Sequence, residues 1–156
     1  AVSVGNVCLR ARYTPEIQLA IDFHIILLQI KEAVESVLEV GGPSSFEEAF
    51  REACRPRQVE LCEMAVSAYV DLRAFGAKLS TGSTNSLDEV LEQRARLLRS
   101  RAAGEEEFRQ EIVQILQAPR TNVYKRCRIY TPLEAERFVQ RALEQARLRQ
   151  QAWEER

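Results

Sequence analysis

Apolar residues fill nearly every position between Leu19 and Ile30. A surface helix shows one apolar stripe, whereas a helix that is apolar on nearly every side is usually covered all round by other helices. The pattern therefore predicts a central, buried helix. We expect it to begin at Thr14-Pro15, a typical N-cap and first helical position, and to end at Gly41-Gly42, a typical C-terminal signal.

A second interior helix is predicted from Pro56 to about Leu79. It has one apolar stripe at three-four spacing and a second apolar face beside it, which is again typical of an interior element. We therefore pair it with the first long helix as the centre of a bundle. The stripe consists of Leu61, Ala65, Ala68, Leu72, Phe75 and Leu79.

Hydrophobic spacing and capping residues predict four further helices. Ser or Thr followed three residues later by Glu forms a capping box, and such a pair precedes three of them. The expected ranges are 46–54, 87–103, 105–118 and 132 to the end of the chain. In the helix 87–103 the residues expected to face the core are Leu87, Val90, Leu91, Leu98 and Ala102, and in the next helix they are Phe108, Ile112, Ile115 and Leu116.

Two segments, 7–13 and 123–130, alternate between apolar and polar positions and are expected to be extended. We expect them to pair as a small ribbon that rests on helices, because an isolated ribbon is marginal in water. The predicted fold is all-α: a five- to six-helix bundle around two apolar central helices, with at most a minor two-stranded ribbon. One helical domain is expected over residues 1–156, with an extended segment at 1–13 and a helix end at 144–156 that is able to project from the bundle.

The composition is that of an ordinary globular domain, with 46% apolar and 29% charged residues. Because the formal net charge is only −1, the molecule as a whole does not attract nucleic acid or anionic lipid. Nearly all of the cations are Arg, whose planar fork suits carboxylates and phosphates. This bias has two explanations, the base composition of the gene or the chemistry of the surface.

The four cysteines, Cys8, Cys54, Cys62 and Cys127, lack the C-x-x-C spacing of a zinc site. We expect buried, reduced thiols, which suit an intracellular protein of the cytoplasm or nucleus. The N-terminus has no signal pattern, and the apolar run around Phe23 is shorter than the ~20 residues that cross a bilayer. We therefore expect no membrane span.

The sequence carries no recognisable catalytic or metal-binding motif. His24 is the only histidine, so neither a Ser-His or Cys-His hydrolase nor a Glu-x-x-His metal site is supported. P-loop, G-x-G-x-x-G and H-E-x-x-H patterns are absent from the sequence. We expect no enzymatic activity, no metal and no cofactor, and His24 is expected to be a structural residue in the core or partly exposed.

Residues 120–130 combine cations with tyrosines. Cations neutralise phosphates and rings stack on bases, so this combination is found at nucleic-acid surfaces. An acidic protein partner would use the same residues, and the simplest alternative is that the cations pair with Glu-rich helices of the chain or stay solvated. The candidate partner-binding residues here are Arg120, Tyr124, Lys125, Arg126, Arg128 and Tyr130.

Leu148 and Trp153 lie in the last helix, where apolar residues become sparse. If exposed, they mark a docking edge or a self-association site, and the alternative is a final turn that folds down or frays. We therefore expect a non-catalytic protein–protein interaction domain of a larger adaptor, regulatory or viral protein. Its partner, an acidic protein or a second copy, is expected to contact segment 120–130, the last helix, or both. Nucleic-acid binding through 120–130 is the alternative function.

Overall fold

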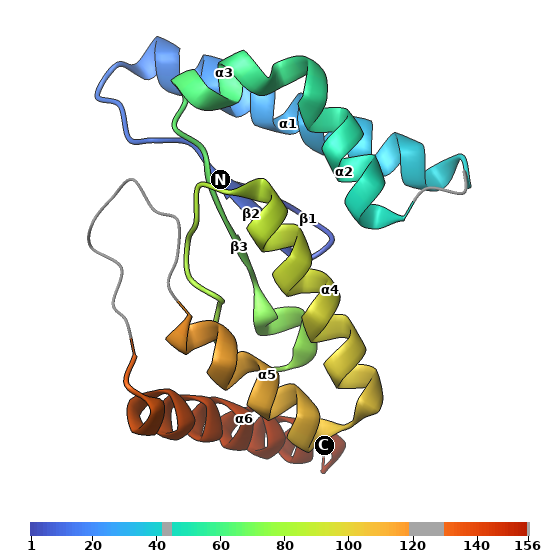
Figure 1. Ribbon diagram of the computed structural model, residues 1–156, viewed down its shortest axis with the longest axis vertical. Helices are drawn as coiled ribbons and strands as arrows, with labels where there is room; N and C mark the ends of the chain where they lie inside the picture. The colour runs from blue at the N-terminus through green and yellow to red at the C-terminus, as the bar shows by residue number, and fades with distance from the viewer. Residues whose placement is uncertain (42–44, 119–129, 156) are drawn as a thin grey trace.

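The computed structural model describes residues 1–41, 45–118 and 130–155, which form six α-helices, two 3₁₀-helices and a three-stranded antiparallel sheet (Figure 1). The prediction of a mostly helical protein is confirmed, but the sheet is larger than the predicted ribbon. The elements in chain order are β1 (Val2–Val4), β2 (Val7–Arg10), α1 (Ile17–Glu39), α2 (Phe46–Cys54), η1 (Arg55–Arg57), α3 (Gln58–Glu63), β3 (Ser67–Val70), η2 (Leu72–Phe75), α4 (Leu87–Ala103), α5 (Glu105–Gln117) and α6 (Pro132–Glu154).

The sheet has the order β1-β2-β3, so β2 is its central strand. The β1–β2 hairpin turns at Gly5 and Asn6, which both have positive φ (51° and 70°), as a two-residue hairpin turn requires. Extension of segment 7–13 is confirmed for β2, but its neighbours are β1 and β3, so the predicted ribbon partner was wrong. Residues 123–129 of that predicted partner lie outside the described residues.

The predicted helix from Pro56 to Leu79 was wrong. Helix α3 ends at Glu63, the chain turns at Ala65 with φ of 43°, and β3 then pairs with β2. The apolar residues of this stretch also fit a period of two, and a short apolar run does not distinguish a strand from a helix. Backbone pairing with β2, more than fifty residues earlier in the chain, stabilises the strand instead of the helix.

Helix α1 was predicted to be covered on all sides, and the structure contradicts this. Only one face is buried, and the opposite face is exposed, so α1 lies at an edge of the fold instead of its centre (Figure 1). The prediction of Thr14 as N-cap and Pro15 as first helical residue was wrong: the helix begins at Ile17, and its N-cap is Glu16, whose backbone is extended and whose side chain makes no cap hydrogen bond. Thr14 Oγ1 instead accepts a hydrogen bond from the Glu16 N–H at 3.2 Å, before the helix. Its predicted end is confirmed, since Gly41 has φ of 68°. The buried residues are Phe23, Leu27, Ile30 and Val34.

The four other predicted helices are confirmed as α2, α4, α5 and α6. Local capping explains the starts of α2, α4 and α6, whereas α5 follows Gly104, which makes no side-chain cap. Complete capping boxes precede α2 (Ser45 with Glu48) and α6 (Thr131 with Glu134). The third box is half made: Ser86 accepts from the N–H of Glu89, whose carboxylate instead accepts from Thr84 Oγ1 at 2.6 Å.

The buried face of α4 is centred one position away from the predicted one. Leu97 is fully buried, whereas Leu98 is 37% exposed and Ala102 is exposed, so the prediction was wrong for the last two. Leu97 lies two turns after the buried Val90 on the same face, and each further residue rotates by about 100°. All four residues predicted to face the core in α5 are buried.

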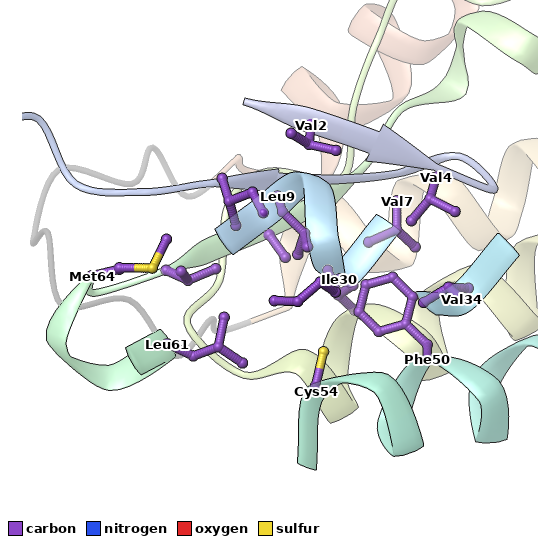
Figure 2. Packing of buried hydrophobic residues seen from close by; sticks show 14 of the residues in the cluster. Val2, Val4, Val7, Leu9, Ile30, Val34, Phe50, Cys54, Leu61 and Met64 are labelled. Atoms are coloured by element: carbon purple, nitrogen blue, oxygen red, sulfur yellow. The ribbon is translucent and has the colours of Figure 1, made fainter. Parts of the chain in front are cut away.

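Buried side chains form two hydrophobic clusters instead of one core around a helix pair. The first cluster lies between the sheet, α1, α2, α3 and the beginning of α4, and Figure 2 shows Phe50 within it, directed toward the strands. The second packs α5 and α6 against η2 and the later part of α4. Strand β3 joins them, because Ala68 belongs to the first and Val70 to the second.

Three cysteines are described, and all three are free thiols. Cys8 and Cys54 are buried as predicted, but Cys62 is exposed, which contradicts the prediction for that residue. Burial raises the pKa of the Cys54 thiol to about 11. Cys127 lies outside the described residues.

We therefore expect Cys62 to react with iodoacetamide much faster than Cys8 and Cys54 in the folded protein, because the thiolate is the nucleophile and Cys62 alone of these three described thiols is exposed. The measurement is a short labelling pulse near neutral pH followed by peptide mass spectrometry. In denaturant the three sites should react at similar rates. Equal labelling of Cys54 and Cys62 without denaturant would contradict the packing of α2.

Candidate docking surfaces

Helix α1 carries a second apolar face that points to solvent. We call Ile17, Ile21, Ile25 and Leu28 the α1 outer face; they are 77%, 46%, 46% and 37% exposed. At 3.6 residues per turn these positions lie on one side of the helix, opposite the buried residues. The apolar all-round pattern in the sequence is thus the sum of two faces, one buried and one exposed.

Polar and mainly acidic residues border the α1 outer face. On one flank, Gln18 Nε2 donates to Asp22 Oδ1 at 3.0 Å. Beyond its C-terminal end lie the exposed Glu32 and the Lys31–Glu35 ion pair, whose Nζ–Oε1 distance is 3.7 Å. Three carboxylates against one ammonium leave this border negatively charged.

The far end of α6 exposes two of the predicted site residues. Leu148 is 59% exposed and Trp153 is 80% exposed. Helical spacing places Trp153 on the same side of α6 as the core-facing residues, yet nothing among the described residues buries it. The end of α6 therefore presents an indole ring to solvent.

Tyr130 belongs to a different part of the surface. Its ring is half-buried and packs on Phe138, with the ring centroids 5.5 Å apart. It precedes the start of α6 and Trp153 lies near its end, so about 30 Å of helix separates them. The structure does not bring these two predicted site residues together. The other predicted members, Arg120, Tyr124, Lys125, Arg126 and Arg128, lie outside the described residues.

A cavity of about 390 Å³ opens between η2, the α4–α5 turn and α6; we call it the α5–α6 cavity. The rings of Phe75 and Phe108 contribute apolar lining, with centroids 5.6 Å apart, and Leu143 adds to it from α6. The charged lining residues are Arg101, Glu105 and Arg147. Sequence reasoning missed this cavity because its walls come from three separate segments of the chain.

The guanidinium of Arg101 lies over the two rings. Its guanidinium carbon lies 5.3 Å from the ring centroid of Phe75 and 5.4 Å from that of Phe108, and its Nη1 donates to the Phe75 carbonyl at 3.0 Å. Arg147 pairs with Glu105, with 2.6 Å between Nη2 and Oε1, although both side chains are about two-thirds exposed (66% and 65%). The cavity thus combines aromatic walls with two cations and one carboxylate.

The Arg-rich side of α4 faces Glu residues of α5, and Arg96 Nη2 lies 2.5 Å from Glu111 Oε1. Glu106 instead pairs within α5, where hydrogen bonds from Arg109 and Gln110 lower the pKa of its carboxyl group to about 2. Such surface pairs account for much of the charge on this hairpin without a partner.

The described residues include neither a cluster of metal ligands nor a membrane-spanning helix. His24 is exposed on α1, and no group of three or more His, Cys, Asp or Glu residues in the described ranges could hold a metal ion. None of the described helices combines the length and apolar character needed to cross a membrane. No protein-family model, no curated protein and no solved structure matches this chain.

Proposed function

We propose that this chain is a non-catalytic protein-interaction domain whose partner binds to the α1 outer face. The observation that carries the proposal is the row of four aliphatic side chains on a helix whose other face is already buried in the core. Contiguous exposed apolar residues with a polar border are typical of interaction sites. Full burial of one such side chain contributes about 1.5–3 kcal/mol, so a partner that covers the row gains substantial binding energy.

The partner that fits best is an amphipathic helix with an aliphatic face and a basic border. The spacing of the α1 outer face matches the i, i+4 and i+7 anchors of helix-on-helix recognition. Asp22, Glu32 and Glu35 favour Arg or Lys at the edges of the partner, and they disfavour a second copy of α1, which would bring like charges together.

This proposal moves the main docking surface away from residues 120–130, 148 and 153, where the sequence placed it. Those residues, and nucleic-acid binding through 120–130, stay predictions. An intracellular setting is part of the proposal, and the free thiols of Cys8, Cys54 and Cys62 suit it.

The test uses a labelled peptide of about 18 residues, or five helical turns, with Leu at i, i+4 and i+7 and Arg along both borders. Fluorescence anisotropy should show binding to the wild-type domain. The double variant Ile21→Glu/Ile25→Glu should bind at least about tenfold more weakly, because two carboxylates replace buried aliphatic contacts. Leu148→Glu is the matched control on α6 and should bind like the wild type.

A second peptide with Glu in place of Arg tests the border charge and should bind more weakly than the Arg peptide. Wild-type affinity in the Ile21→Glu/Ile25→Glu variant would overturn the proposed surface. A dimer in light scattering that the same variant dissociates would replace the partner helix with a second copy and overturn the proposed occupant.

A further inference from the structure

We propose that the α5–α6 cavity binds the C-terminal residue of a protein chain, with its apolar side chain against Phe75 and Leu143 and its terminal carboxylate on Arg101. This site is separate from the α1 outer face, and the proposal does not depend on the function proposed for that face. It rests on the shape of the cavity, on the position of two arginines at its edge and on the surrounding carboxylates.

The size and lining of the cavity suit one large side chain. Its volume of about 390 Å³ lies within the range of ligand sites, and the half-buried Phe75 and Leu143 supply apolar contacts. Phe108 is 2% exposed and belongs to the second hydrophobic cluster, so this wall is anchored to the folded body. An aromatic or large aliphatic side chain can therefore pack there without rearranging the core.

Arg101 is positioned for a carboxylate next to that side chain. Contact with both rings and the Nη1 bond to the Phe75 carbonyl restrict the guanidinium before any ligand binds. Only one of its five N–H donors is used in that bond, and the fork of Nε and Nη2 suits bidentate binding of a carboxylate. Because the guanidinium lies over the rings that line the cavity, the ligand must carry its carboxylate close to its apolar group, as a C-terminal residue does.

Arg147 supplies a second cation, and breaking its ion pair with Glu105 costs little free energy. Its pair with Glu105 is about two-thirds exposed on both sides (66% and 65%), and exposed pairs contribute little to stability. Arg147 can therefore turn from Glu105 to a ligand carboxylate. The net charge of these three lining residues is +1, which matches a single carboxylate.

The surrounding charge disfavours a polyanion. Glu105 lines the cavity, and Glu106 and Glu107 follow it in the first turn of α5. A nucleic-acid backbone would bring successive phosphates against these carboxylates, whereas a C-terminus brings one negative charge to the arginines. The geometry therefore favours a peptide C-terminus over single-stranded nucleic acid.

The full chain can be tested with one matched pair of peptides. Both end in Leu-Phe after a Gly-Ser spacer; one has a free C-terminal carboxylate and the other a C-terminal amide. Trp153 is the only tryptophan of the sequence and lies one turn beyond Gln150, which lines the cavity, so its fluorescence reports binding. We expect the acid to bind about tenfold or more tightly than the amide, since a charge-assisted contact is lost with the amide.

Substitutions of Arg101 test whether this residue binds the terminal carboxylate of the peptide. Arg101→Gln should reduce the affinity for the acid to about that for the amide, and Arg101→Lys should bind with intermediate affinity because it keeps the charge without the fork. Arg99→Gln is the matched control, because Arg99 lies on α4 but does not line the cavity. This variant should bind the acid like the wild type. Ile21→Glu/Ile25→Glu should also leave this binding unchanged, which separates the two proposals.

Three results would overturn the inference. The first is equal affinity for the acid and the amide, and the second is wild-type affinity of Arg101→Gln for the acid. The third is displacement of the acid by a single-stranded oligonucleotide at equal concentration in the wild type but not in Arg101→Gln, because the cavity would then be a nucleic-acid site. Circular dichroism of each variant checks that the fold is retained.

Discussion

Replacing Phe50 by alanine is expected to lower the free energy of unfolding by about 3–5 kcal/mol. Phe50 is fully buried (0% exposed) and lies in the first hydrophobic cluster, where Figure 2 shows its ring between Ile30, Val34 and the strand residue Val7. Removing the ring forfeits its transfer free energy and leaves a cavity between α1, α2 and the sheet. Denaturant unfolding followed by circular dichroism measures the change.

Two further variants make this prediction decisive. A domain with about 5–15 kcal/mol of stability can lose most of it through Phe50→Ala, so Phe50→Leu provides a smaller cavity that keeps the transition measurable. Val59→Ala, at a 72% exposed position of α3, should change stability by less than about 0.5 kcal/mol. Similar losses for Val59→Ala and Phe50→Ala would contradict the packing of α2 beneath the sheet.

Gly5→Ala is expected to cost about 2–4 kcal/mol, the second largest effect. The φ of Gly5 is 51°, and a Cβ placed there would lie 2.2 Å from Cε2 of Phe46, so the substitution adds a clash to backbone strain. The Phe46 ring has little freedom to retreat, because the Arg94 guanidinium lies 3.7 Å from its centroid. Arg94 is itself held by the Gly5 carbonyl at 2.6 Å and Glu47 at 2.9 Å.

Gly41→Ala separates the cost of backbone strain from the cost of the steric clash. Gly41 also has positive φ (68°), but no atom lies within 4 Å of an added Cβ, so only the backbone strain remains and we expect about 1–2 kcal/mol. In a Phe46→Ala background the cost of Gly5→Ala should fall to a similar value, because the clashing ring is gone. If Gly5→Ala stays equally costly in that background, the contact between the hairpin turn and α2 is not the cause.

Features that depend on a few neighbouring residues could be predicted from the sequence. Capping residues and hydrophobic spacing gave α2, α4, α5 and α6 with bounds close to those observed, because a helix start is set by hydrogen bonds within about one turn. The sparse apolar pattern after residue 143 left two alternatives for the end of the last helix, an exposed edge or a turn that folds down or frays, and the structure exposes Leu148 and Trp153.

The β1–β2 hairpin carried a readable signal that the prediction missed. Gly5-Asn6 is flanked by alternating residues on both sides, the pattern of a two-residue hairpin. Strand β3 had no such signal, because its period of two coexists with a helical period in the same residues. Only its hydrogen bonds to β2 resolve that ambiguity, and they join parts of the chain far apart in sequence.

The sequence by itself determined that the protein is mostly helical, where most helices begin and end, and that α1 is apolar on nearly every side. Only the tertiary structure decided which of those sides is covered, and that is why the α1 outer face emerged from the structure alone. The same holds for the α5–α6 cavity, whose rings and arginines meet through packing of η2, α4, α5 and α6. The physical reason is that periodicity reports how apolar a face is, whereas burial depends on which distant segment lies against it.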